Sequence, residues 1–343
     1  MKELNELFIN RDLNYDEPVT MATVTSRERK AIPHRFDGKV AIVTGGTSGI
    51  GFAVVEELLK EGCKVAFTGR NADTAKTAMG ALDAKGLKDY LFIQADTKYD
   101  EDCKRIADTA YEHFGRVDYL VNNAFPFGST RRNLDNEVWY NSFEGGPLAY
   151  ARMMQHVCNY MIEVGGGAIV NTSSISGHIA QYGNWTYNTM KGIVGMLTKS
   201  AAMDFARDNI RVNTMSPAHI WTRQTSRGIS GERQQDPERT LQHVRFTAKG
   251  YMLNRGGESV ECASVVLFLL SDDASYITGC DYMVDGGFIT LGSQGAIDKG
   301  YRDEREYGIR PIYGMSGPSN RGGSGTLFRD KPVSDYPELF KNN

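Results

Sequence analysis

The chain has 343 residues, of which 41% are hydrophobic and 24% are charged, and its net charge is -3. This composition is typical of a folded globular protein and excludes a disordered chain. Acidic residues slightly outnumber basic ones, 42 to 39, so the chain lacks the basic field that binds phosphate backbones, and we expect no nucleic-acid partner.

The compartment is predicted from the cysteines and from the apolar runs. The five cysteines are scattered and odd in number, which indicates a reducing compartment rather than a disulfide framework. No apolar run has the length of a membrane span, and the N-terminus is acidic where a signal peptide would be basic. We therefore expect a cytoplasmic protein without a membrane contact. The six histidines lack metal-binding spacing, so we expect no metal.

Residues 1–37 form a polar leader with two prolines and no periodicity, which predicts an N-terminal arm. From Lys39 onward, short apolar runs alternate with amphipathic segments. The predicted strands cover residues 39–46, 64–70, 89–96, 117–124, 168–174, 210–218 and 282–287. The predicted helices cover residues 52–62, the Ala-rich segment after residue 70, and residues 151–164, 186–208 and 259–272.

This alternation predicts an α/β protein with a single Rossmann-type, doubly wound parallel sheet in three layers over residues 38–290. An irregular segment at about residues 222–255 is predicted to form a substrate lid. Residues 291–343 are rich in Gly, Pro, Arg and Tyr, and we expect this C-terminal tail to be an arm that wraps a neighbouring subunit. The chain is therefore expected to form a homo-oligomer, either a dimer or a tetramer.

A glycine-rich loop, TGGTSGIG, separates the first predicted strand from the first helix. In this context Gly45 permits a tight turn, Gly49 lets the backbone approach a pyrophosphate, and Gly51 allows close helix packing. The helix N-terminus favours the bound anion. The loop residues predicted to bind a dinucleotide are Gly45, Thr47, Ser48, Gly49, Ile50 and Gly51.

The end of the second strand distinguishes NAD from NADP. A carboxylate there would bind the ribose 2'-hydroxyl and repel a 2'-phosphate, but the sequence has Thr68, Gly69 and Arg70. A guanidinium can form a charge-assisted pair with the phosphate, so NADP(H) is preferred. The alternative, a surface arginine stacked on adenine, would be compatible with NAD(H).

Four motifs together resemble the short-chain dehydrogenase/reductase family: TGxxxGxG, NNA at 122–124, a serine upstream of YxxxK, and DGG at 285–287. The resemblance covers about residues 38–290. The further cofactor contacts that it implies are Asp96 at the adenine, Asn122 at the adenosine ribose, and Ile220 and Thr222 at the carboxamide.

Tyr187 and Lys191 lie four residues apart in a predicted helix, so their side chains share one face. An ammonium near the phenol favours the phenolate, which makes Tyr187 a candidate acid/base. Ser174 ends a predicted strand, where its hydroxyl can donate to a carbonyl oxygen. By the resemblance, Lys191 also holds the ribose hydroxyls. These three residues are the predicted catalytic set.

Two departures from the family pattern bear most on the predicted site. Phe125 replaces the glycine that normally follows NNA, which places an aromatic ring beside the nicotinamide site or pushes the loop outward. The asparagine of the preceding helix is missing near Gly146 and Pro147. A Gly-Pro pair can distort a helix and free a carbonyl in its place. Glu144 is the alternative substitute.

The presumed site is rich in aromatic side chains, which favours a flat ring ketone or alcohol. The predicted substrate contacts are Phe125, His178, Trp185 and Trp221. We predict an NADP(H)-dependent carbonyl reductase or alcohol dehydrogenase that transfers a hydride between nicotinamide and a ketone or secondary alcohol. The alternatives are a 3-oxoacyl thioester reductase and a non-enzymatic dinucleotide-sensing protein.

Overall fold

The computed structural model describes residues 29–130, 134–222, 251–253 and 256–291, and only the backbone of Trp221. Contacts divide the chain into two units. The larger unit comprises Thr25–Gly228 and Gly257–Asp285, and the smaller unit comprises Met1–Val24, Ile229–Gly256 and Gly286–Asn343.

Of the smaller unit, only residues 251–253, 256 and 286–291 are described. The Leu253 amide donates to the Gly286 carbonyl, and the rings of Tyr251 and Phe288 lie 5.3 Å apart. Most of the predicted lid and nearly all of the predicted C-terminal arm lie outside the described residues.

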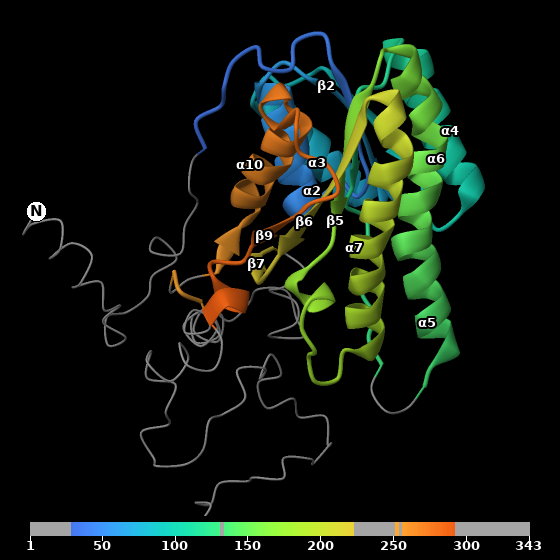
Figure 1. Cartoon of the computed structure of the whole chain (residues 1–343). Coiled ribbons are helices and arrows are strands. Elements are labelled where there is room, and N and C mark those ends of the chain that lie inside the picture. Colours follow the sequence, from blue (N-terminus) through green and yellow to red (C-terminus); the bar gives the residue numbers. More distant parts are fainter. Residues whose placement is uncertain (1–28, 131–133, 223–250, 254–255, 292–343) are drawn as a thin grey trace, which may run out of the picture. The chain divides into compact units, whose positions relative to one another are not determined.

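The larger unit contains a seven-stranded parallel sheet (Figure 1). Its strands are β1 (Val40–Val43), β2 (Lys64–Gly69), β3 (Tyr90–Gln94), β4 (Tyr119–Asn122), β5 (Gly167–Thr172), β6 (Ile210–Pro217) and β9 (Asp281–Val284). The spatial order is β3-β2-β1-β4-β5-β6-β9. A separate two-stranded sheet pairs β7 (Ile220–Trp221) with β8 (Gly257–Glu258). The predicted Rossmann-type fold class is confirmed.

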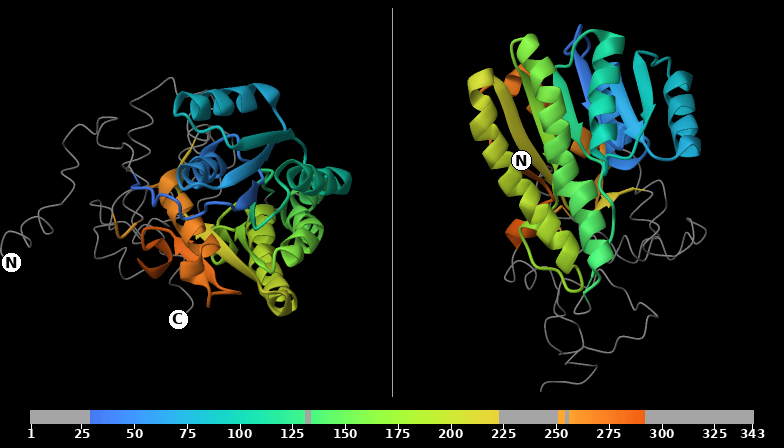
Figure 2. Two further views of the ribbon diagram at one scale, coloured as in Figure 1. Left: turned by 90° about the horizontal axis from the view of Figure 1, so that it is seen from above. Right: turned by 90° about the vertical axis from the view of Figure 1, so that its right-hand side faces the viewer.

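Helices cover both faces of the sheet (Figure 2). On one face lie α2 (Gly49–Lys60), α3 (Ala72–Ala84) and α10 (Ser259–Leu270), and on the other α4 (Asp100–Phe114), α6 (Ala149–Glu163) and α7 (Trp185–Phe205). β1 shows why two cores form: its alternating side chains send Ala41 and Val43 into the first and Ile42 into the second.

Helix α4 is among the elements that the prediction above did not include. Its first turn carries Asp100, Glu101 and Asp102, which favour the positive end of the helix dipole. It ends at Gly115, which adopts the left-handed conformation with φ 78°. The sequence therefore contained both end signals of this helix.

Part of the predicted N-terminal arm is packed against the domain. Arg29 and Arg35 pair with the fully buried Glu61 at 2.5 and 2.6 Å. Phe36 is buried and lies edge-on to Tyr119, with ring centroids 5.6 Å apart. Residues 29–37, which the prediction placed in the arm, therefore contribute contacts to the packed domain.

A π-helical turn, Glu144–Leu148, joins α5 (Asn136–Phe143) to α6. Gly146 has non-helical dihedral angles of φ -109° and ψ -108°, and Pro147 follows it. The expected distortion at the Gly-Pro pair is therefore present.

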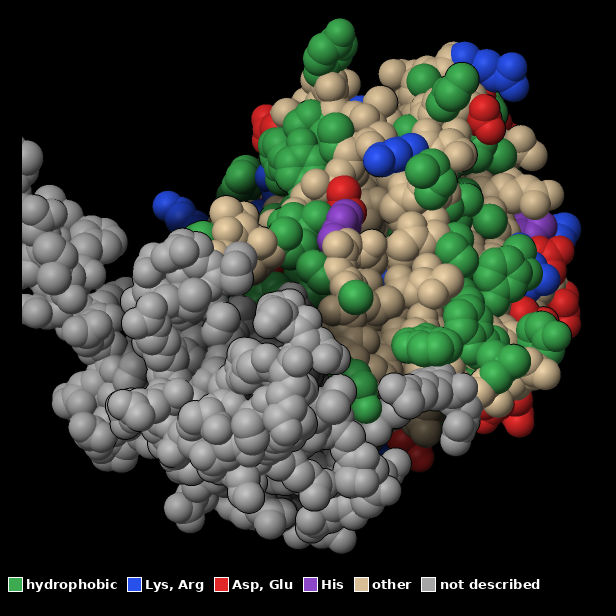
Figure 3. All heavy atoms as spheres, turned by 60° about the horizontal axis from the view of Figure 1, so that its bottom comes forward, with side chains coloured by type: hydrophobic (Ala, Val, Ile, Leu, Met, Phe, Trp, Pro, Cys, Tyr) green, Lys and Arg blue, Asp and Glu red, His purple; other side chains and the backbone are tan. Residues whose placement is uncertain are grey.

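Several large apolar side chains are exposed on helices α5 and α7. They include Tyr140 and Phe143 on α5, and Trp185, Met196 and Met203 on α7. Figure 3 shows hydrophobic side chains gathered at the right of the described face. No helix within the described part of the chain is long and apolar enough to cross a bilayer.

Candidate active site

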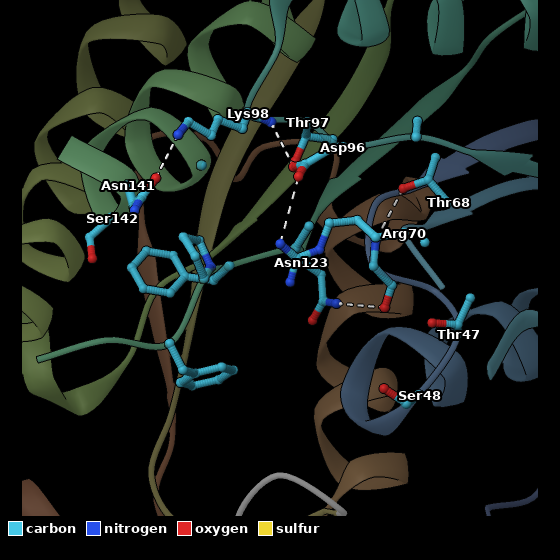
Figure 4. Close-up of a pocket in the computed structure, with 18 of the residues that line it drawn as sticks. Thr47, Ser48, Thr68, Arg70, Asp96, Thr97, Lys98, Asn123, Asn141 and Ser142 are labelled. Carbon is cyan, nitrogen blue, oxygen red and sulfur yellow. Dashed lines mark hydrogen bonds and ion pairs between the residues drawn. The ribbon is translucent and has the colours of Figure 1, made fainter. Parts of the chain in front are cut away.

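The site lies where the strand order of the sheet reverses, because β4 pairs with β1 on the side opposite β2. Crevices that bind dinucleotides form at this point, outside the carboxyl ends of the strands. A cavity of about 750 Å³ is present there, lined by residues that follow β1, β2, β3 and β4 (Figure 4).

The glycine loop has the geometry that a pyrophosphate requires. Gly45 and Gly49 have φ values of 66° and 58°, in the left-handed region that favours glycine. Ser48 precedes α2 without a side-chain cap, so the helix amides are not satisfied by that hydroxyl. These residues fit a nicotinamide dinucleotide with its phosphates at the start of α2.

Gly51 is sterically required in this loop. A Cβ at this position would lie 2.3 Å from the Gly45 carbonyl oxygen and 2.5 Å from Nδ2 of Asn123. We therefore expect Gly51→Ala to destabilise the protein by about 1–3 kcal/mol and to weaken dinucleotide binding. Thermal unfolding and fluorescence titration measure the two effects. Gly80→Ala is the matched control, because a Cβ there meets no atom within 4 Å; equal behaviour of the two variants would contradict the steric argument.

Arg70 and Asp96 face each other in the part of the cavity next to the ends of β2 and β3 (Figure 4). Their side chains form an ion pair with Nη1 and Oδ2 3.6 Å apart, and the Arg70 side chain is 70% exposed. An exposed pair of this length is weak, so the guanidinium can turn to another anion at little cost.

Asn122 does not line the cavity. Its side chain is buried and donates to Oδ1 of Asn171 at 2.9 Å, which ties β4 to β5. The next residue, Asn123, lines the cavity instead and donates to the carbonyls of Thr44 and Gly45 at 3.1 and 3.2 Å. Asn122 is the last residue of β4 and Asn123 is the first residue after it, at the strand end where the cavity lies. The contact of Asn122 with an adenosine ribose stays a prediction.

Lys98 was missed by the sequence reasoning. It lines the cavity, and its Nζ donates to Asn141 at 2.5 Å (Figure 4). The same Nζ lies 3.3 Å from a carboxylate oxygen of Glu144. Its position in the sequence could have indicated this, because Lys98 follows the third predicted strand. Residues after parallel strands lie at the carboxyl edge of the sheet, where the cavity forms. Glu144 therefore forms an ion pair with Lys98. Its predicted role as a substitute for the missing asparagine stays a prediction.

Ser174, Tyr187 and Lys191 are brought together from two elements. Ser174 follows β5, while Tyr187 and Lys191 lie on α7. Gly177 allows the approach, because a Cβ there would lie 2.8 Å from the Lys191 backbone. The Lys191 ammonium donates to the Thr172 carbonyl at 2.9 Å and lies 5.8 Å from the centroid of the Tyr187 ring.

Burial dominates the electrostatics of this group. It lowers the pKa of Lys191 from 10.5 to about 7. Burial also raises the pKa of Tyr187, and a hydrogen bond with the Ser174 hydroxyl opposes that effect. In this structure the phenol therefore favours its neutral form, and the Lys191 ammonium is not among the groups that shift the pKa of Tyr187.

Two aromatic rings stand between this group and the cavity. Phe125 and Phe127 both line the cavity. The Phe125 ring is edge-on to the Tyr187 ring at 5.5 Å, and the Phe127 ring is stacked on it at 6.1 Å. The sequence left two outcomes open for Phe125, a ring beside the site or a loop pushed outward. In the structure the ring lines the cavity and contacts Tyr187.

The remaining predicted residues are spread more widely. His178 pairs with Asp281 at 2.8 Å, and Trp185 is 56% exposed at the start of α7. Thr222 lines the cavity, while Ile220 is buried in β7. The Trp221 side chain lies outside the described residues. Within those residues, no cluster of His, Cys, Asp and Glu could hold a metal ion.

The fold and the cavity thus define a doubly wound, dinucleotide-binding α/β protein. The family model described as enoyl-(acyl carrier protein) reductase matches residues 45–289. Dehydrogenase/reductase SDR family member 4 of Caenorhabditis elegans is 35% identical over 255 residues, which cover 74% of this chain and 96% of that protein. The chain belongs to the short-chain dehydrogenase/reductase family.

Other relatives are named for an activity. The NADP-dependent (R)-specific alcohol dehydrogenase of Lentilactobacillus kefiri is 33% identical, with 74% of this chain and 98% of that protein covered. The cyclohexanol dehydrogenase of an Acinetobacter strain is 33% identical, with coverage of 76% and 98%. The solved structure of Thermoplasma acidophilum aldohexose dehydrogenase has a TM-score of 0.68 and 30% identity, with 76% and 97% covered. The chain is accordingly an oxidoreductase that acts on CH-OH or C=O groups and uses a nicotinamide dinucleotide.

Proposed function

We propose that this protein is an NADP(H)-dependent carbonyl reductase that also works in reverse as an alcohol dehydrogenase. The observation that carries the proposal is the convergence of Ser174, Tyr187 and Lys191 behind the Phe125 ring. That ring lines a cavity that also contains the glycine loop. The bound nicotinamide would supply or accept the hydride.

The roles of the three residues follow from their chemistry. Ser174 donates a hydrogen bond to the substrate oxygen as negative charge develops there. Tyr187 gives a proton to that oxygen during reduction and takes it back during oxidation. Lys191 holds positive charge next to the phenol and thereby stabilises the phenolate that remains after proton transfer.

The proposed substrate class is a ring-containing ketone or secondary alcohol. Phe125 and Phe127 present ring surface to the cavity, which favours flat apolar substrates. The similarity to a cyclohexanol dehydrogenase supports the same class. The second candidate, a 3-oxoacyl thioester reductase, is favoured by the acyl-carrier description of the family model.

A substrate screen tests the proposal. NADPH oxidation by the purified full chain is followed by absorbance with cyclic ketones, sugar ketones and 3-oxoacyl esters. Turnover of cyclic ketones is the expected result. Exclusive turnover of 3-oxoacyl esters would favour the second candidate, and no turnover of any class would contradict both.

The preference for NADP(H) is proposed to depend on Arg70. We expect Arg70→Ala to weaken NADPH binding about 10- to 100-fold and NADH binding no more than about threefold, because only the 2'-phosphate loses a charged partner. Calorimetric titration with each dinucleotide measures this. Arg207→Ala removes the same charge at an exposed position that pairs with Asp208 and does not line the cavity, and it serves as the control. Equal losses of affinity for NADPH and NADH in Arg70→Ala would contradict a contact between Arg70 and the 2'-phosphate.

We propose a homo-oligomer, either dimer or tetramer, in the cytoplasm. The exposed apolar side chains of α5 and α7 support the assembly. The free state of all five cysteines supports a reducing compartment. The lid and the C-terminal arm remain part of this proposal as predictions from the sequence.

A further inference from the structure

The Phe125 ring lies directly over the Lys191 ammonium. Nζ is 3.9 Å from the ring centroid, well within the distance at which a ring face attracts a cation. The two residues come from distant parts of the chain, since Phe125 follows β4 and Lys191 lies in the middle of α7. The same ring lines the cavity, so it separates the ammonium from the space where a dinucleotide would bind.

The ring can occupy this position because residue 146 has no side chain. A Cβ at Gly146 would lie 2.6 Å from Cε2 and 3.1 Å from Cδ2 of Phe125. The ring therefore fills the space that a side chain of the π-helical turn would otherwise take. The two departures from the family pattern, at residues 125 and 146, are therefore packed against each other, and the phenylalanine ring fits because of the glycine.

Few other groups stabilise the ammonium. Lys191 is 3% exposed, and its hydrogen bond goes to the Thr172 carbonyl. The other titratable side chains that face it are Tyr187 and Tyr150, whose ring centroids lie 5.8 and 6.0 Å away. Among the described residues no carboxylate contributes to the pKa of Lys191, which burial alone brings to about 7.

We propose that Phe125 is a positioning residue whose ring, seated against Gly146, holds Lys191 in its charged form one helical turn from Tyr187. The inference deepens the proposed function and depends on it only for the catalytic consequence. The seating of the ring and its effect on Lys191 can be measured without turnover.

The direct test is a pH titration of Lys191 by NMR. The protein is labelled with 13C at lysine Cε, and Lys191→Met identifies the signal. In Phe125→Leu, which keeps an apolar side chain and excludes water, we expect the pKa of Lys191 to fall by about one pH unit. Phe125→Tyr keeps the ring face and should restore the wild-type value. An unchanged or raised pKa in Phe125→Leu would overturn the proposal.

A double-mutant cycle tests the seating of the ring even if one substitution perturbs folding. Gly146→Ala should lower Tm by several degrees when Phe125 is present and by much less in the Phe125→Ala background, where the ring is absent. Additive changes would show that the ring does not occupy the space at Gly146.

The catalytic consequence appears in the pH profile of carbonyl reduction. In this profile, activity should fall at high pH as Lys191 loses its proton. In Phe125→Leu that fall should begin about one pH unit lower, because the pKa of Lys191 is lower. If the NMR shift occurs but no carbonyl substrate is turned over, the proposed function fails and the role of the ring stands. If turnover occurs without any shift in either measurement, the proposed function stands and the role of the ring is overturned.

Discussion

Tyr187→Phe is expected to lower kcat for carbonyl reduction about 10²- to 10⁴-fold, the range for loss of a general acid. Only the phenolic oxygen is removed, so the ring contacts with Phe125 and Phe127 are retained. The Kd for NADPH should stay within about twofold, because the glycine loop and Arg70 are untouched.

Steady-state kinetics and a fluorescence titration with NADPH measure the two quantities. Tyr140→Phe is the matched control, since Tyr140 is an exposed tyrosine on α5. Substantial turnover by Tyr187→Phe would refute its role as the proton donor. A large loss of NADPH affinity would instead indicate a structural effect of the substitution.

Lys191→Met is expected to lose activity and to gain stability near neutral pH. A pKa lowered from 10.5 to about 7 corresponds to a burial cost of at most about 5 kcal/mol for the cation. Methionine also gives up the hydrogen bond of the side chain to the Thr172 carbonyl, a loss of about 1–3 kcal/mol. Methionine fills a similar volume without the charge, so the free energy of unfolding should rise by about 2 kcal/mol.

The pH dependence of this gain identifies its cause. Below about pH 7 both the folded and the unfolded states hold the proton, so the full burial cost is present. Between about pH 7 and 10.5 the unfolded state binds more protons than the folded state, so the wild-type protein becomes more stable as pH rises. The advantage of Lys191→Met should therefore shrink across this window.

Urea unfolding of both proteins at several pH values between 6 and 9.5 measures the difference. Lys199→Met, an exposed lysine on the same helix, is the control and should show no such trend. A stability difference that is constant with pH would mean that the cost of burying the ammonium is not its cause.

Local patterns in the sequence were sufficient to predict the fold class, the glycine loop and the pairing of Tyr187 with Lys191. Strand and helix periodicities are properties of a few consecutive residues, and a four-residue spacing on a helix fixes a shared face. The same reasoning missed α4, although its acidic first turn and terminal glycine were present. It assigned Asn122 to the adenosine ribose, whereas the residue that lines the cavity is Asn123, the first residue after β4.

Only the tertiary structure showed how segments that lie far apart in the chain pack together. The packing of Phe125 between Gly146 and Lys191 joins the β4 loop, the π-helical turn and α7, and no spacing along the sequence determines such distances. The pKa of Lys191 depends likewise on how completely these three segments exclude water. The sequence by itself determined which chemical groups are available and which neighbours share a helix, because local backbone geometry sets both. Only the folded chain determined which groups are buried together, because burial depends on all the segments that pack around them.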